Sequence, residues 1–161
     1  MQKRKSLRLK EYNYSTNGSY FITICSKDKS NLFCSIDENI TNASYDNIDF
    51  SKYIYYTKIG LVIKENIDFV NDKYDSIKIE NYVIMPNHIH LLINLLENNK
   101  SSLSNIIMSF KRSVTMKCKS KIWQRSFYDR IIRNQKELDK IIEYIIYNPF
   151  RWKLDEYFNN C

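Results

Sequence analysis

The chain has 161 residues, 43% of them apolar, which is enough to bury a core and predicts a single domain spanning residues 1–161. Its 25 lysines and arginines against 18 aspartates and glutamates give a formal charge of +7, which fits a polyanionic partner such as nucleic acid about as well as a generally basic protein. The four cysteines form no C-x-x-C pair, which disfavours zinc knuckles and disulfide scaffolds. No stretch is apolar enough for a secretory signal or a membrane span, which disfavours membrane proteins and predicts a cytoplasmic location.

The first half of the chain is predicted to hold one strand and one helix. Residues 1–15 are basic and without periodicity, which is typical of an arm that is mobile or lies along a phosphate backbone. Aromatic and β-branched residues predict a strand over 19–25, and a polar loop is expected over 37–50. A helix is predicted over 51–71 because apolar residues recur there at helical spacing, at Ile54, Ile59, Val62, Ile63 and Ile67.

The second half is predicted to combine strands and helices around a break at Pro86, which lacks a backbone N–H. Its elements are strands over 77–82 and 88–94, a helix over 101–119, an extended aromatic segment over 122–133, a helix over 137–147 and a short tail over 150–161. The order β-α-β-β-α-β-α predicts an α+β fold, with an antiparallel sheet and helices packed on one of its faces.

The only two histidines, His88 and His90, stand one residue apart in a predicted strand. A strand turns alternate side chains to the same face, so both imidazoles would project together while Ile89 and Leu91 point the other way. Neutral imidazole is the commonest protein ligand for a divalent cation, so the pair is half of a metal site. The alternative is a pair of strand histidines that make ordinary hydrogen bonds.

The predicted C-terminal helix carries Tyr144 and Asn148, whose i,i+4 spacing places them on one edge of its buried face. Tyr147 points about 100° away from Asn148 and cannot share that edge. A phenol hydroxyl and an amide oxygen beside two imidazoles would form a metal-assisted phosphoryl-transfer site, although Asn148 before Pro149 is also an ordinary helix end. Lys140, one turn before Tyr144, is a candidate electrostatic helper for a phenol whose ordinary pKa is about 10; a solvated lysine is the alternative.

Four ordered motifs, spread over about residues 7–152, carry a resemblance to a known family. They are His88-Ile89-His90, Trp123-Gln124-Arg125, Ile132-Arg133-Asn134 and Tyr144-Ile-Ile-Tyr-Asn148-Pro149. The first resembles the HUH motif (His, hydrophobic, His) of single-tyrosine transposases, and the set looks like the REP-associated tyrosine transposases of the insertion-sequence-200-like superfamily. The chain departs from many relatives by carrying Arg130 where they have a histidine, and by its short tail.

The resemblance implies a ferredoxin-like or RRM-like fold that cleaves and rejoins single-stranded DNA beside hairpins. It implies that Tyr144 is the nucleophile that forms a 5′-phosphotyrosine, that His88, His90 and Asn148 are metal ligands, and that the cofactor is Mg²⁺ or Mn²⁺ without a nucleotide. Whether subunits pair as a homodimer is left open. The alternative function is a domesticated protein that binds hairpin DNA or RNA without cutting it, and a replication or conjugation nickase is disfavoured by the small size.

Cationic and aromatic residues of the second half are candidate DNA contacts, because cations meet phosphates and aromatic rings stack on unpaired bases. An ordinary solvated helix face and an aromatic core are the respective alternatives. The candidates are Lys111, Arg112, Lys117, Trp123, Gln124, Arg125, Arg130 and Arg133.

Overall fold

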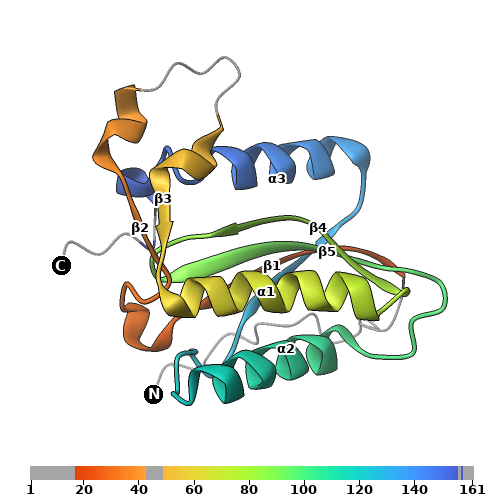
Figure 1. Cartoon of the computed structure of the whole chain (residues 1–161). Helices are drawn as coiled ribbons and strands as arrows, with labels where there is room; N and C mark the ends of the chain where they lie inside the picture. The colour runs from red at the N-terminus through yellow and green to blue at the C-terminus, as the bar shows by residue number, and fades with distance from the viewer. Residues whose placement is uncertain (1–16, 43–48, 156, 158–161) are drawn as a thin grey trace, which may run out of the picture.

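The computed structural model describes residues 17–42, 49–155 and 157, and its centre is a four-stranded antiparallel sheet (Figure 1). The strands are β1 (Gly18–Cys25), β4 (Ile77–Ile84), β5 (His88–Leu95) and β6 (Tyr128–Ile132), in the order β4-β5-β1-β6. The predicted α+β class and antiparallel sheet are confirmed. The predicted basic arm over 1–15 lies outside the described residues, as does part of the predicted tail over 150–161.

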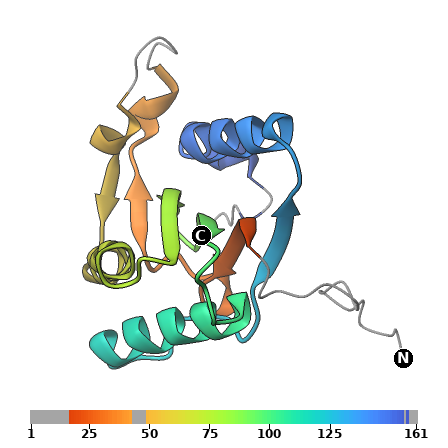
Figure 2. The same ribbon diagram turned by 90° about the vertical axis from the view of Figure 1, so that its right-hand side faces the viewer.

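Two helices cover one face of this sheet (Figure 2). They are α1 (Lys58–Lys73) and α2 (Leu103–Cys118), each begun by a hydroxyl N-cap: Thr57 accepts from the Gly60 N–H and Ser102 from the Asn105 N–H. Gly60 permits a close approach, because a Cβ there would lie 2.1 Å from the Phe33 carbonyl oxygen. Beneath the helices lies the larger apolar core, which includes alternate residues of the two central strands: Tyr20, Ile22, Ile24, Ile89, Leu91 and Ile93.

The third helix, α3 (Gln135–Tyr147), lies across the opposite face of the sheet (Figures 1 and 2). Asn134 caps it by accepting from the Glu137 N–H. Its Ile141 and Ile145 pack on Leu92 of β5 in a second, smaller apolar cluster. The expectation that the helices share one face is therefore correct for α1 and α2 and wrong for α3. Sequence periodicity identifies which stripe of α3 is buried, but it does not say which sheet face receives that stripe.

A two-stranded sheet of β2 (Cys34–Ile36) and β3 (Ile54–Tyr56) was not expected from the sequence. The apolar residue Ile54 belongs to β3, so the helix predicted over 51–71 begins only at Lys58, after the Thr57 cap. The predicted loop over 37–50 contains short 3-10 segments. The 3-10 segments of the described chain are Lys27–Lys29, Glu38–Asn42, Phe50–Tyr53 and Trp152–Leu154.

The last predicted strand is shorter than its aromatic pattern suggests. Of the segment 122–133, only Tyr128–Ile132 forms β6, and Trp123 makes an isolated bridge with Ser26.

Within the described ranges, no helix has the length and apolar character needed to cross a bilayer.

Candidate metal centre and nucleophile

The two histidines lie side by side on the α3 face of β5. His88 is 0% exposed and His90 is 1% exposed, and their Nε2 atoms are 3.1 Å apart. This confirms that alternation along the strand turns both imidazoles to one face, while Ile89 and Leu91 enter the other core. Two ring nitrogens directed at one point can bind a single cation without a change in the backbone.

Each imidazole is oriented by a partner on its other nitrogen. Nδ1 of His88 is 2.9 Å from Oδ1 of Asn87, and Nδ1 of His90 is 2.8 Å from the Thr23 hydroxyl on the neighbouring strand. The Asn87 amide nitrogen donates to the carbonyls of Lys29 and Tyr157, so its oxygen faces His88 and accepts the Nδ1 proton. The Nε2 lone pair of His88 is then directed into the site, which is the usual arrangement of a metal-binding histidine.

Burial keeps both rings neutral. Removal from water lowers the pKa of His88 well below its ordinary value and that of His90 to about 3. A neutral imidazole is the form that binds a cation, so the pair is available as a ligand at neutral pH.

Tyr144 reaches the histidine pair from α3. Its hydroxyl oxygen lies 3.4 Å from Nε2 of His90, and its ring meets Phe21 edge to face at 5.9 Å. Phe21 stacks on His90 with ring centroids 5.0 Å apart, so it fixes the phenol and the imidazole relative to each other. The ring of Tyr147 lies instead 5.7 Å from that of Phe50, which agrees with the prediction that Tyr147 does not share the edge of Asn148.

Asn148 ends α3 beside the same site and is 2% exposed. Its amide nitrogen donates to Oδ2 of Asp155 at 3.2 Å, while its Oδ1 is buried without a hydrogen-bond partner among the described residues. A buried carbonyl oxygen left without a partner costs about 1–3 kcal/mol, and an ion is one of its ordinary explanations. The two imidazoles and this amide oxygen fit a divalent cation that takes nitrogen and oxygen ligands.

Asp155 is a carboxylate of this site that the sequence analysis missed. One of its carboxylate oxygens and one ring nitrogen of each histidine lie within 4.8 Å of one another. It follows the segment Trp152–Leu154, where no periodicity distinguishes one carboxylate from another. The rings of Trp152 and Tyr157 lie 6.0 Å and 4.6 Å from the ring of His88, so this segment also helps to bury the histidines.

Two of the predicted DNA contacts have structural roles. The Lys111 ammonium donates to the carbonyls of Gln124, Arg125 and Ser126, and burial lowers its pKa. The Trp123 indole donates to the Lys111 carbonyl, and its ring packs in the larger core. Both side chains therefore hold the 124–126 loop against α2.

The other predicted contacts divide between the two faces. Arg112 and Lys117 are exposed on α2, on the face away from the histidines. Arg130 lies opposite Phe21 in the β1–β6 register, hence on the histidine face, and pairs with Glu137 of α3. Of the remaining candidates, Arg125, Arg133 and Lys140 are exposed and Gln124 is half-buried.

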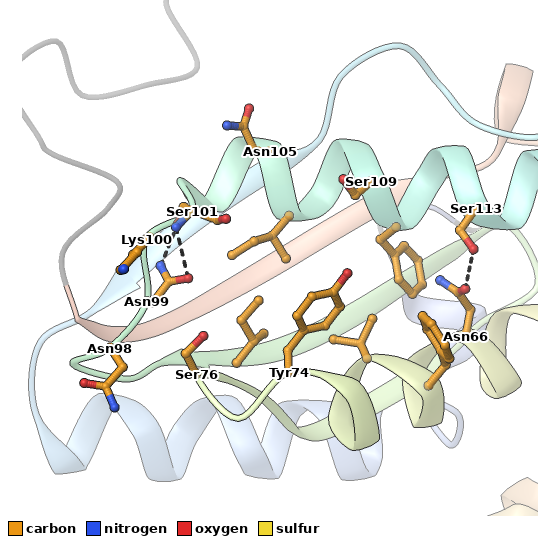
Figure 3. A pocket seen from close by; sticks show the side chains of 15 residues that line it. Asn66, Tyr74, Ser76, Asn98, Asn99, Lys100, Ser101, Asn105, Ser109 and Ser113 are labelled. Carbon is orange, nitrogen blue, oxygen red and sulfur yellow. Dashed lines mark hydrogen bonds between the residues drawn. The ribbon is translucent and has the colours of Figure 1, made fainter.

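A cavity of about 380 Å³ opens between α1 and α2, on the face opposite to the histidines (Figure 3). Asparagine and serine side chains dominate its polar lining, and the Ser113 hydroxyl donates a hydrogen bond there to the amide oxygen of Asn66. No histidine, cysteine, aspartate or glutamate is among its lining residues, so it lacks the imidazole and carboxylate groups that gather at the histidine pair.

The family model described as "Transposase IS200 like" matches residues 50–148, a range that includes the histidines, Tyr144 and Asn148 but not Asp155. An uncharacterised Haemophilus influenzae protein is 30% identical over 178 residues, covering 95% of this chain and 92% of that protein. The chain belongs to the IS200-like transposase family.

Other similarities agree with this family. A second Haemophilus influenzae protein, provisionally named a REP-associated tyrosine transposase, is 34% identical over 82 residues, covering 42% of this chain and 47% of that protein. A REP-associated tyrosine transposase solved with a REP hairpin has a TM-score of 0.62 at 22% identity, covering 92% of this chain and 77% of that one. A Deinococcus radiodurans transposase candidate has a TM-score of 0.50 at 12% identity, covering 86% and 95%. These two solved structures share the fold.

Proposed function

We propose that the protein is a metal-dependent transposase that cleaves and rejoins single-stranded DNA beside hairpins, through a 5′-phosphotyrosine on Tyr144. The observation that carries the proposal is the position of the Tyr144 hydroxyl, 3.4 Å from Nε2 of His90 and next to a second buried imidazole. A nucleophile and a set of metal ligands thus meet at one point, as a phosphoryl-transfer site requires.

The residues of the site have separate tasks in this reaction. The Tyr144 oxygen gives up its proton and attacks the phosphorus in line, the bond to the 3′-oxygen breaks and that oxygen takes up a proton, and the 5′-phosphate stays on the tyrosine. Return attack by a 3′-hydroxyl reverses the step and rejoins the strand without a nucleotide cofactor. Mg²⁺ or Mn²⁺ held by His88, His90 and Asn148 would polarise the phosphate and stabilise the leaving oxygen. Phe21, which contacts both rings, keeps the phenol beside the imidazoles.

The nucleophile acts on the site of its own chain in this proposal. Tyr144 of α3 already contacts His90 of the same chain, and α3 is tied to the sheet by Ile141 and Ile145. A monomer therefore contains every group that the reaction needs, and pairing into a homodimer is not required.

The DNA approaches along β6 in this proposal. Tyr128 is 43% exposed and lies opposite Thr23 in the strand register, on the face that carries His90. An exposed ring at this position can stack on an unpaired base next to the scissile phosphate, and Arg130, two residues along the same strand, can meet a neighbouring phosphate.

Incubation with hairpin-flanked single-stranded oligonucleotides tests the proposal. We expect a slowly migrating species on a denaturing gel that needs Mg²⁺ or Mn²⁺, is sensitive to protease, and retains a label placed 3′ of the cut but not one placed 5′ of it. Intact oligonucleotides with and without the cation, together with a shifted band on a native gel, would instead identify a hairpin-binding protein that does not cut.

A further inference from the structure

Asp155 has no part in the function proposed above, yet its carboxylate lies at the histidine pair. One of its oxygens and one nitrogen of each imidazole lie within 4.8 Å of one another. It is the acidic member of the one cluster of metal-binding side chains found among the described residues. A carboxylate placed against two neutral imidazoles in a buried site is a candidate ligand for a cation.

Two hydrogen bonds help to orient this carboxylate. Oδ2 accepts from the amide nitrogen of Asn148 at 3.2 Å, and Oδ1 accepts from the backbone N–H of Tyr157 at 2.8 Å. Each carboxylate oxygen has a second lone pair, so both bonds are compatible with metal binding. The bond from Asn148 uses its amide nitrogen, so the buried Oδ1 of Asn148 keeps no hydrogen-bond partner among the described residues.

The spacing of the two imidazole nitrogens agrees with one six-coordinate ion. With metal–ligand bonds of about 2.1 Å, neighbouring ligand atoms of an octahedron are about 3.0 Å apart and opposite ones about 4.2 Å. The two Nε2 atoms, 3.1 Å apart, match a neighbouring pair, and the 4.8 Å limit on the Asp155 oxygen leaves room for either relation.

Asp155 differs from the other proposed ligands because its carboxylate carries a negative charge. Two neutral imidazoles and an amide supply no negative charge, whereas Mg²⁺ and Mn²⁺ are hard cations that prefer carboxylate oxygen. We propose that Asp155 is a fourth protein ligand of the divalent cation, beside His88, His90 and Asn148. This inference rests on the proposed function, because it adds a ligand to the same metal site.

Titration of the DNA-free protein with Mn²⁺, followed by the electron paramagnetic resonance signal of the free ion, tests this assignment without measuring cleavage. Asp155→Asn removes the charge but keeps an oxygen that can accept from Asn148, and we expect it to raise the Kd for Mn²⁺ at least about tenfold. Asp155→Ala is expected to weaken binding at least as much. Asp139→Asn, which removes an exposed carboxylate from α3, is the matched control and should leave the Kd unchanged.

Two results would overturn the assignment. Wild-type affinity in both Asp155 variants would show that the carboxylate has no role in metal binding. Weak binding in Asp155→Ala with wild-type affinity in Asp155→Asn would show that Asp155 only positions Asn148. Thermal unfolding with and without Mn²⁺ verifies that each variant is folded and reports binding a second time.

His90→Ala in the same titration separates this inference from the proposed function. Loss of Mn²⁺ binding in His90→Ala but not in Asp155→Asn would leave the proposed metal site intact and remove only Asp155 from it. A wild-type protein that binds no Mn²⁺ would overturn both.

Discussion

The two faces of the central sheet differ in what they bury. Toward α1 and α2, β5 presents Ile89, Leu91 and Ile93 to a continuous apolar core. Toward α3, the same strand presents His88 and His90 to a site of polar and aromatic groups. Alternation along one strand thus separates the residues that stabilise the fold from those that can do chemistry. Substitutions on neighbouring positions of β5 should therefore have effects of different kinds.

The largest expected effect is that of removing the Tyr144 hydroxyl. Tyr144→Phe should reduce formation of the covalent DNA adduct by on the order of 10³-fold or more, because it removes the oxygen that attacks the phosphorus. The ring contact with Phe21 remains, so the free energy of unfolding should change by no more than about 1.5 kcal/mol. Tyr147→Phe is the control, and equal loss of adduct in both variants would contradict the assignment.

The next effect is on stability and comes from the other face. Leu91→Ala should lower the free energy of unfolding by about 2–5 kcal/mol, since it leaves a cavity in the larger core. The Mn²⁺ affinity of the folded fraction should stay close to that of the wild type. Urea unfolding and Mn²⁺ titration measure the two quantities, and a large loss of metal affinity in folded Leu91→Ala would break the separation of the faces.

The histidine face should make stability depend on pH. The pKa of His90 is lowered from 6.5 to about 3 by burial, and that of His88 is lowered in the same direction, so below pH 6.5 the unfolded chain binds more protons than the folded one. Their contribution is therefore complete above that pH and is lost as the pH falls. Without metal, the free energy of unfolding should fall by up to about 1.4 kcal/mol per histidine for each pH unit below about 6.5.

Urea unfolding at pH 7 and pH 5 measures this dependence. His90→Gln removes one of the two titrating groups and should flatten the pH dependence relative to the wild type. An identical slope in the two proteins would mean that His90 is protonated equally in the folded and unfolded states.

The smallest expected effect is on the salt dependence of DNA binding. It is measured by replacing one arginine on each face of the sheet. Arg130→Ala, on the face of the histidines, should reduce the slope of log binding constant against log salt concentration by about 0.7 for single-stranded DNA, as expected for one lost phosphate contact. Arg112→Ala, on α2, should change this slope less. A larger effect of Arg112 would place the DNA across α1 and α2 instead.

Local patterns predicted most of the sheet and the orientation of the histidines. Alternation in 88–94 and the i,i+4 relation of Tyr144 and Asn148 depend only on the geometry of one strand and one helix, and the structure agrees with both. The face chosen by α3 and the pairing of β2 with β3 depend on contacts between distant segments, which no local pattern encodes.

The partners of the site were harder to predict than its central residues. Asp155 lies in an irregular segment, and only the fold brings it to the histidines. Thr23 reaches His90 because β1 and β5 pair in register, which a single strand pattern does not specify. Asn87 was the one partner with a local signal, since it directly precedes His88.

Peptide mapping of the covalent DNA adduct by mass spectrometry tests the central claim most directly, because two of the tyrosines that the structure describes lie at the histidine pair. Tyr144 has its hydroxyl 3.4 Å from His90, and Tyr157 has its ring 4.6 Å from that of His88. The account predicts that the nucleotide is attached to the α3 peptide at Tyr144. Attachment at Tyr157 or at any other residue would contradict it.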